Sequence, residues 1–319
     1  MLTLLWVRKG VDFYMKAVIT GATGAIGMAL IELLEKNKIE TLVLCRGDSA
    51  RSSRIKESDF IKKVDCSLEQ MSTFSLNISD KYDVFFHFAW SGTTGESRND
   101  MYLQNNNVRY TLDAVNLASR LGCHTFIGAG SQAEYGRVEG VITPNTPTNP
   151  ENGYGIAKLC AGQMSREVAA KLGIKHIWTR ILSVYGPYDG SMTMVTSTIR
   201  KLLSGEIPKF TAAEQTWDYI YGKDAARALL ALAERGQDKE VYCIGNGRSR
   251  MLKDYINIIR DTVDKNAQLM IGAVPYAPNQ VMKLEVDISK LTEHTGFSPE
   301  YSFEDGIAET VEWIRRNTI

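Results

Sequence analysis

The stretch that decides the fold reads Lys16-Ala17-Val18-Ile19-Thr20-Gly21-Ala22-Thr23-Gly24-Ala25-Ile26-Gly27. A short apolar run comes first, three glycines spaced three apart follow, and an apolar helical pattern continues to Leu34. Glycine permits a sharp turn and lets the backbone approach a pyrophosphate without a Cβ in the way, and the free N–H groups at a helix start attract phosphate. We therefore predict a strand, a glycine turn and a helix that bind a dinucleotide. The residues expected to contact it are Gly21, Thr23, Gly24, Ala25, Ile26 and Gly27.

The balance of charges argues against nucleic acid and membranes as partners. Lysines and arginines total 37, as do aspartates and glutamates, so no overall field attracts nucleic acid or an anionic membrane. A chain of 319 residues is long enough for one large nucleotide-binding domain and a smaller lobe. We expect a small polar ligand as the partner.

The cysteines, the histidines and the first residues bear on location and metal content. Five cysteines form no Cys-x-x-Cys pair, which suggests buried thiols in a reducing compartment, and we expect a cytoplasmic protein. Four histidines show no metal-ligand spacing, so no catalytic metal is expected. The apolar run Leu2–Trp6 is too short for a signal peptide or a membrane span, and residues 1–14 are predicted to be an added extension.

The end of the second predicted strand, Thr41–Cys45, bears on the choice of cofactor. NAD-binding folds place a carboxylate there to bind the adenosine ribose, whereas the 2′-phosphate of NADP would be repelled by it. Arg46 stands at that point, and a loop rich in serine and arginine follows it as far as Arg54. We predict that NADP(H) is preferred, with NAD(H) as the alternative because Asp48 could still reach a ribose.

Strands and helical patterns continue to alternate along the chain. Further strands are predicted at 60–66, 82–90 and 125–130, with a helix at 99–121. This alternation predicts an α/β fold with a doubly wound parallel (Rossmann) sheet, whose ligand lies at the carboxyl ends of the strands. At these ends the cofactor is assigned Asp65, Cys66 and Ala89, and the substrate is assigned Trp90.

Three residues further along suggest proton-transfer chemistry. Tyr154 and Lys158 are four apart on a predicted helix, so both side chains share one face. A neighbouring ammonium favours the phenolate form of tyrosine, which brings the phenol towards the range where it can exchange a proton. Ser131 follows a strand end and is placed to bond the same substrate oxygen. The predicted catalytic set is Ser131, Tyr154 and Lys158.

The chain from Met15 onward resembles the extended short-chain dehydrogenase/reductase family, and in particular its nucleotide-sugar epimerase, dehydratase and reductase branch. The resemblance implies that Tyr154 and Lys158 also contact the cofactor, with Lys158 on the nicotinamide ribose, and that the protein is a homodimer formed through a four-helix contact. The resemblance rests on six motifs that occur in the family's order: TGxxGxxG at 20–27, the strand at 83–90, the serine segment at 131–136, YxxxK at 154–158, RxxNVYGP at 180–187 and RDxxYVxD at 217–224.

Departures from the family pattern narrow the expected chemistry. Dehydratases of the family place Asp-Glu after the catalytic hydroxyl residue, but Gln132 and Ala133 stand here, so dehydration is not expected. Asn107 matches the asparagine of the family's NxxGT motif and is assigned to the cofactor. Ser183 replaces an asparagine that contacts the sugar nucleotide, and Trp217 replaces an arginine near its phosphates. The sugar or nucleotide pocket is therefore expected to be atypical.

The predicted division is a dinucleotide-binding Rossmann domain at 15–186 and a smaller mixed α/β substrate lobe at 187–319, with the chain returning to the first domain around 220–245. The segment at 207–211 resembles the one that runs beside the nucleotide base. Lys209 and Phe210 are candidates there, although a solvated lysine and core aromatics explain Lys209, Phe210 and Trp217 equally well. The full set assigned to the substrate is Trp90, Gln132, Ser183, Lys209, Phe210 and Trp217.

Three functions are compatible with these residues. The first is an NADP(H)-dependent oxidoreductase that reduces the C4 ketone of an NDP-4-keto-6-deoxyhexose. The second is an NAD-dependent UDP-hexose 4-epimerase that uses the same three catalytic residues. The third is a nucleotide-binding sensor without chemistry, which would have no need of the serine, tyrosine and lysine.

Overall fold

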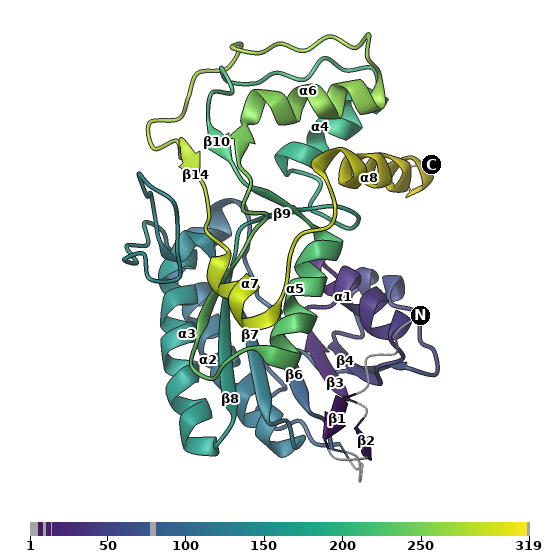
Figure 1. The fold of residues 1–319 in the computed structure, drawn as a ribbon, viewed down its shortest axis with the longest axis vertical. Helices are drawn as coiled ribbons and strands as arrows, with labels where there is room; N and C mark the ends of the chain where they lie inside the picture. Colours follow the sequence, from purple (N-terminus) through teal and green to yellow (C-terminus); the bar gives the residue numbers. More distant parts are fainter. Residues whose placement is uncertain (1–5, 9–10, 14, 77–80, 318–319) are drawn as a thin grey trace.

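A computed structural model describes residues 6–8, 11–13, 15–76 and 81–317. Within these residues, a seven-stranded parallel sheet with the order β12-β8-β7-β6-β3-β4-β5 forms the centre of the molecule (Figure 1). Its strands are β3 (Ala17–Thr20), β4 (Thr41–Cys45), β5 (Ile61–Asp65), β6 (Val84–His87), β7 (Thr125–Ser131), β8 (Lys175–Ile181) and β12 (Val241–Ile244). The predicted α/β fold with a parallel sheet is confirmed.

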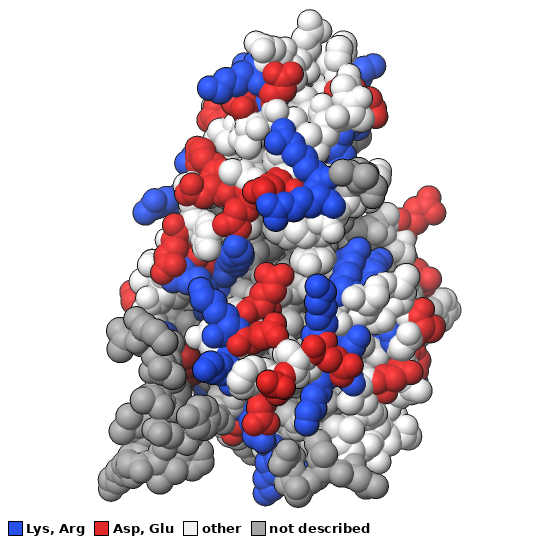
Figure 2. Space-filling view, turned by 90° about the vertical axis from the view of Figure 1, so that its right-hand side faces the viewer, with Lys and Arg blue, Asp and Glu red and all other residues white. Residues whose placement is uncertain are grey.

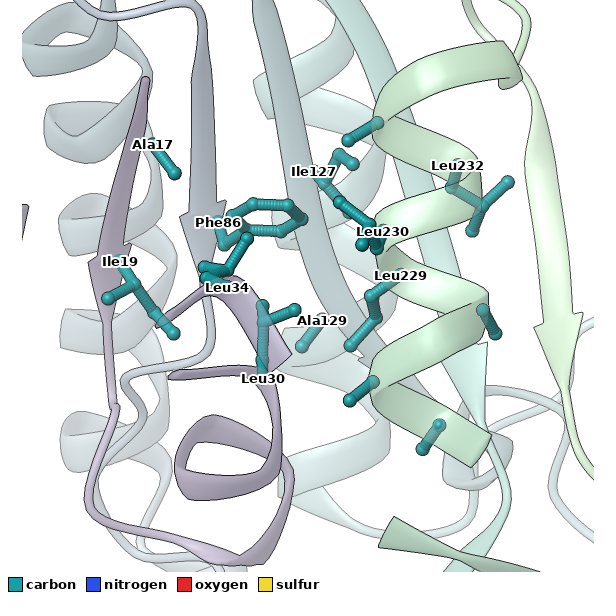
Figure 3. Close-up of a cluster of buried hydrophobic side chains, with 14 of the residues drawn as sticks. Ala17, Ile19, Leu30, Leu34, Phe86, Ile127, Ala129, Leu229, Leu230 and Leu232 are labelled. Carbon is teal, nitrogen blue, oxygen red and sulfur yellow. The ribbon is translucent and has the colours of Figure 1, made fainter. Parts of the chain in front are cut away.

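Helices cover both faces of this sheet, which explains why its central strands are almost continuously apolar. The first face carries α1 (Ala25–Lys36) and α5 (Gly222–Arg235), and the second carries α2 (Met101–Arg120) and α3 (Gly153–Leu172). Along β3, Ile19 packs on the first face and Val18 on the second, as strand alternation requires. Figure 3 shows Leu30 of α1 and Leu229 of α5 meeting the sheet side chains.

The order of the strands fixes where a ligand can bind. From β3 the chain proceeds outward to β4 and β5, and then returns across the sheet to β6, on the other side of β3. Connections therefore leave the carboxyl ends of β3 and β6 in opposite directions, which opens a crevice between them. The strand predicted at 82–90 is shorter than expected, because residues 88–90 leave the sheet after His87 and line this crevice.

A second lobe is built around its own apolar cluster of buried side chains. Three helices supply most of it, and two small sheets, β9-β11 and β13-β10-β14, lie beside them. The helices are α4 (Met194–Leu203), α6 (Leu252–Val263) and α8 (Phe303–Asn317), and the strands are β9 (Ser183–Tyr185), β10 (Thr216–Trp217), β11 (Tyr219–Tyr221), β13 (Arg250–Met251) and β14 (Lys283–Leu284). Between the lobe's segments, α5 packs on the first face of the main sheet and β12 pairs with β8. The helix α7 (Ser289–Thr295) packs against α5. The domain bounds themselves stay a prediction.

The predicted extension at 1–14 contains an antiparallel pair, β1 (Trp6–Arg8) and β2 (Val11–Phe13), while residues 1–5, 9–10 and 14 lie outside the described part. Lysines, arginines, aspartates and glutamates are interspersed over the face of the molecule in Figure 2, in keeping with the balanced composition. Within the described ranges, none of the helices is long and apolar enough to cross a membrane.

Candidate active site

Two adjoining cavities occupy the crevice at the carboxyl ends of the strands. The first cavity, of about 490 Å³, extends from the glycine turn across the ends of β4 and β5. The second, of about 420 Å³, extends from the same turn to the ends of β7 and β8 and the start of α3. Gly21, Trp90 and Thr93 line both, so the two cavities form one elongated site.

The glycine turn is shaped to receive a phosphate group. Gly21 has a φ of +72°, and a Cβ there would collide with the main chain of Ala89. Gly24 is the N-cap of α1 and offers no side-chain cap, and an added Cβ at Gly24 would meet no atom within 4 Å. The first N–H groups of α1 therefore face open space without a side-chain partner, and the positive end of the helix favours an anion there. These residues fit the pyrophosphate of a dinucleotide.

The end of the first cavity near β4 brings together several of the predicted cofactor residues. Arg46 and Cys66 line it, and so do Ser49 and Arg51 of the following loop, which contains the 3-10 turn η1 (Ala50–Arg54). Asp65 does not line the cavity: its carboxylate accepts a hydrogen bond from the Gly47 N–H at 2.7 Å and holds the turn after β4. The predicted cation, Arg46, therefore lines the cavity, whereas the predicted carboxylate, Asp65, holds the turn beside it.

Asn107 and Gln104 of α2 support the crevice loop from behind. The amide of Asn107 is buried and bonds both the N–H and the C=O of Ser91, at 2.9 and 2.8 Å. Gln104, which the sequence analysis missed, accepts a hydrogen bond from the Trp90 indole at 2.8 Å and donates to Gly92 O. The polar groups of both side chains are thus already hydrogen-bonded to this loop. Gln104 could have been selected from the sequence because it is a polar residue on the inner face of a predicted helix.

Ser131, Tyr154 and Lys158 meet in the second cavity, where all three line the wall. Asn152 caps α3 by accepting a hydrogen bond from the Gly155 N–H at 2.9 Å, so Tyr154 lies in the first turn of the helix. Ser131 ends β7, and its hydroxyl is close enough to the Tyr154 phenol to favour the phenolate form. The predicted set thus lies at the end of a strand and the start of a helix that face one another.

Lys158 is held deep in this wall. Its ammonium donates to the Ala129 carbonyl at 2.5 Å and lies 3.7 Å from the centre of the Trp90 ring. Burial lowers the pKa of Lys158 to about 7, and the negative charge of Glu134 opposes this shift. The residue is therefore close to the point where it exchanges a proton at neutral pH.

Tyr154 differs from the prediction in one respect. Burial raises the pKa of its phenol, and the hydrogen bond from Ser131 and the charge of Arg98 only partly oppose the increase. The expected lowering by Lys158 is not found, because the ammonium is turned towards Ala129 and lies 5.8 Å from the centre of the phenol ring. The closer cation is Arg98, at 4.3 Å from the same centre, from the 3-10 turn η2 (Gly95–Asn99). The sequence analysis missed Arg98.

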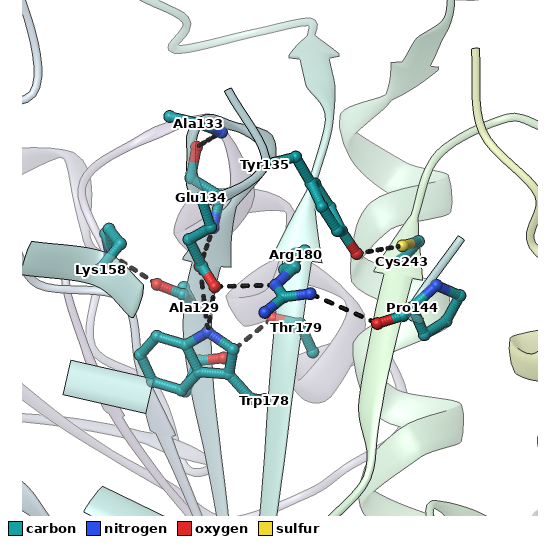
Figure 4. Close-up of polar contacts among 12 residues, drawn as sticks. Ala129, Ala133, Glu134, Tyr135, Pro144, Lys158, Trp178, Thr179, Arg180 and Cys243 are labelled. Carbon is teal, nitrogen blue, oxygen red and sulfur yellow. Dashed lines mark hydrogen bonds and ion pairs between the residues drawn. The ribbon is translucent and has the colours of Figure 1, made fainter. Parts of the chain in front are cut away.

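Glu134 is a second residue that the sequence analysis did not select. It lies in the 3-10 turn η3 (Gln132–Glu134), and its fully buried carboxylate accepts hydrogen bonds from Ser131 N–H, Trp178 Nε1 and Arg180 Nε (Figure 4). The Ser-x-x-Glu spacing of 131–134 is that of a capping box, and it could have marked Glu134 from sequence.

The candidate substrate residues are only partly brought together. Trp90 lines both cavities, whereas the other five line neither of them: Gln132, Ser183, Lys209, Phe210 and Trp217. Ser183 accepts a hydrogen bond from the Trp217 indole at 2.8 Å, so these two residues satisfy each other. Asp189, which was not predicted, does line the second cavity. Among the described residues, no group of three or more histidine, cysteine or acidic side chains is arranged to hold a metal ion.

A profile of the NAD dependent epimerase/dehydratase family matches residues 17–245. The chain belongs to this family. The expected membership of the nucleotide-sugar branch of the extended short-chain dehydrogenases/reductases is thereby confirmed.

Among its relatives in this family, the chain is 26% identical over 210 residues to a dTDP-glucose 4,6-dehydratase of Xanthomonas campestris, a match that covers 62% of this chain and 60% of that one. The chain thus spans between about half and three fifths of the length of the dehydratases that it matches. A putative UDP-glucose 4-epimerase of Methanocaldococcus jannaschii is 24% identical over 94% of this chain and 98% of its own length. The solved structure of UDP-glucose 4-epimerase from Thermotoga maritima, with UDP-glucose, superimposes with a TM-score of 0.84 at 25% identity, covering 96% of this chain and all of that chain.

Proposed function

We propose that this protein is an NAD(P)-dependent nucleotide-sugar 4-epimerase. The observation that carries the proposal is the meeting of Ser131, Tyr154 and Lys158 in a cavity that opens onto the glycine turn. The reductase that the sequence put first would use the same residues. In sequence, similarity over 94% of this chain to a protein described as a putative UDP-glucose 4-epimerase supports the epimerase instead, whereas the sequence match to the dehydratase of Xanthomonas campestris covers 60% of that protein. Solved structures of both kinds of enzyme superimpose along almost the whole chain.

The described residues divide the work of such a reaction among them. A bound dinucleotide supplies the hydride acceptor and donor for the sugar C4. Tyr154 takes the proton of the C4 hydroxyl and later returns it, while Ser131 bonds the same oxygen. Lys158 holds the cofactor ribose, Arg98 supplies positive charge beside the phenol, and Trp90 closes the wall where the two cavities join.

A 4-ketoreductase that uses NADPH is the second candidate, and two observations favour it. Arg46, Ser49 and Arg51 line the first cavity with cations and hydroxyls, as a 2′-phosphate requires. Burial raises the pKa of Tyr154, which keeps its phenol protonated and ready to donate a proton to a ketone oxygen.

One experiment separates the candidates. The purified protein is incubated with UDP-glucose or UDP-galactose and NAD⁺, and in parallel with NADPH and an NDP-4-keto-6-deoxyhexose. Interconversion of the two UDP-hexoses without net consumption of cofactor supports the epimerase. Stoichiometric oxidation of NADPH supports the reductase. If neither reaction occurs while the cofactor binds, both proposals fail.

A dehydratase activity is not proposed, although the family includes dehydratases. The positions after Ser131 hold Gln132 and Ala133, and the next carboxylate along the chain, Glu134, is fully buried and committed to three donors. An NDP-hexose incubated with the protein and NAD⁺ should therefore give no 4-keto-6-deoxy product, as followed by its absorbance in alkali. Appearance of that product would show that other groups supply the elimination acid and base.

We also infer that two copies of the chain associate through α2 and α3. These helices pack side by side and expose large apolar side chains, among them Tyr102 at 88% and Ile156 at 50%. Apolar groups of this size on neighbouring helices are typical of an interface. Analytical ultracentrifugation should find a dimer that the double substitution Tyr102→Glu/Ile156→Glu converts to a monomer. A wild-type protein that sediments as a monomer at micromolar concentration would contradict this.

A further inference from the structure

A buried ion pair lies directly behind the catalytic serine. The carboxylate of Glu134 has no exposed surface, and Arg180 of β8 is 7% exposed. Arg180 Nε donates to this carboxylate at 2.8 Å and the Trp178 indole donates at 3.0 Å (Figure 4). Buried charges are retained when their partners satisfy them in this way, and removal of one partner leaves the other uncompensated. The pair is therefore a rigid, fully satisfied unit.

The unit is tied to the active site through the main chain of Ser131. Glu134 Oε1 accepts a hydrogen bond from the Ser131 N–H at 2.8 Å, while Ser131 Oγ accepts one from the Ala133 N–H at 3.2 Å. The same Ser131 hydroxyl shares the wall of the second cavity with Tyr154 and favours the phenolate form of that residue. An anchored carboxylate on the serine N–H thus limits the positions that the hydroxyl can take.

Close packing keeps Glu134 from moving. A Cβ at Gly130 would collide with both the Glu134 carboxylate and the Trp178 indole, so only glycine fits between them. On the other side, a Cβ at Gly162 would come within 2.6 Å of the Trp178 ring. Two glycines from β7 and α3 therefore make room for an acid and an indole where a core would otherwise hold apolar side chains.

Glu134 cannot act on the substrate itself, because it lines neither cavity and its oxygens are occupied. We propose that Glu134 is a positioning residue, which holds Ser131 against Tyr154 and places a fixed negative charge behind Lys158. This inference rests on the proposed function only in that these three residues carry out the proton transfer. Glu134 lies within the serine segment at 131–136, but the sequence analysis gave it no role.

The charge of Glu134 reaches both titrating groups of the site. It opposes the lowering of the Lys158 pKa by burial, and it adds to the raised pKa of Tyr154. Removal of this charge should therefore lower the pKa of both residues. Among the other titratable or charged groups, His87 interacts with Lys158 and Arg98 interacts with Tyr154. Arg180 and Cys243 interact with Glu134, and Tyr135 interacts with both of them.

Two substitutions separate the two roles of Glu134. Glu134→Gln removes the charge, and Glu134→Asp keeps the charge but withdraws the carboxylate from the Ser131 N–H. In Glu134→Gln, kcat should fall by roughly ten- to a hundredfold and both limbs of its pH profile should move to lower pH. In Glu134→Asp, kcat should fall while the pH profile stays in place. Cofactor affinity, measured by calorimetry, should stay within about twofold in both.

A titration that needs no turnover keeps this inference distinct from the proposed function. The protein is labelled with 13C-tyrosine, the Tyr154 resonance is assigned with Tyr154→Phe, and its pKa is measured by NMR. The pKa should be lower in Glu134→Gln than in the wild type. If the pKa moves but no sugar nucleotide is converted, the positioning role stands and the proposed function fails.

The controls address stability. Asp224 of α5 is also fully buried, and it accepts hydrogen bonds from Arg227 and from the Tyr301 N–H. Asp224→Asn should lower thermal stability without moving the Tyr154 titration. Should Glu134→Gln fold poorly, Glu134→Gln/Arg180→Met removes both charges and is measured in its place. A Tyr154 pKa and a pH profile that coincide with those of the wild type would overturn the proposal.

Discussion

At Lys158, burial makes the charged form costly in the folded protein. The pKa of this lysine is lowered to about 7 when folded, whereas an unfolded chain would leave it near its usual value of about 10.4. Below pH 7 both states carry the proton, and the folded state keeps a buried charge. Between about pH 7 and pH 10 the unfolded state binds more protons, so the stability of the folded state rises with pH through this window.

Lys158→Met should reveal this cost. The methionine has no charge to bury, so the variant should gain thermal stability relative to the wild type most clearly below pH 7, and the gain should shrink as pH approaches 10. Tm measured by calorimetry from pH 6 to pH 10 tests the sign. A Tm difference that does not depend on pH would mean that Lys158 is not titrating in this range. The same variant should bind cofactor more weakly, because it loses the ribose contact.

Tyr154→Phe removes a single oxygen and keeps the ring that packs beside Trp90 and under Arg98. Cofactor binding and Tm should therefore change little, while kcat should fall by roughly 10²- to 10⁴-fold, as is typical when a general acid or base is lost. Turnover of a UDP-hexose or of a 4-keto sugar nucleotide measures this. Wild-type turnover in Tyr154→Phe would exclude the phenol from proton transfer.

Substitution of Arg98 should change the pKa of the same Tyr154 phenol. Its guanidinium opposes the raised pKa of Tyr154, so Arg98→Met should raise that pKa further and Arg98→Lys should restore part of the effect. NMR titration of labelled tyrosine distinguishes the two variants. Identical pKa values in Arg98→Met and the wild type would mean that the guanidinium has no influence on the phenol.

At the scale of an element, the loop after β4 should decide the choice of coenzyme. A guanidinium contact to a 2′-phosphate contributes about 1.5–3 kcal/mol, so NADPH should bind roughly ten- to a hundredfold more tightly than NADH. Arg46→Asp should reverse the preference by repelling the phosphate. Lys62→Asp on β5, an exposed position that lines neither cavity, is the matched control for the change in charge. Tighter binding of NADH by the wild type would contradict this preference and strengthen the epimerase proposal.

Elements that depend on local pattern could be predicted from the sequence. The glycine turn, the buried strands and the start of α3 follow from glycine spacing, apolar runs and the cap Asn152, all of which act within a few residues. Ser131, Tyr154 and Lys158 were found for the same reason: Ser131 ends a strand, and Tyr154 and Lys158 lie in the first two turns of a helix that its cap defines. The structure places them together because the strand order brings β7 beside the start of α3.

What the sequence did not reveal depends on groups far apart along the chain. The raised pKa of Tyr154 combines burial, the charges of Arg98 on η2 and Glu134 on η3, and the Ser131 hydroxyl at the end of β7, and no spacing on α3 encodes this combination. Asp65 was selected for its place at a strand end and Asn107 for its match to the family pattern, yet the side chains of both residues bond main-chain groups of nearby turns. The Trp217 indole likewise donates a hydrogen bond to Ser183, which joins β10 to β9. These two strands come into contact only when the lobe is folded.

At the scale of the whole molecule, the late return of the chain to the main sheet constrains how the protein can be made. Strand β8 pairs with β12 on its outer side, and Leu229 and Leu232 of α5 cover the first face of the sheet. Until a ribosome has released residues 222–244, the growing sheet has an open edge at β8 and an uncovered apolar face. A fragment that stops at residue 186 should therefore aggregate when expressed, and one that continues through Ile244 should remain in solution longer, which sedimentation of the two lysates would compare.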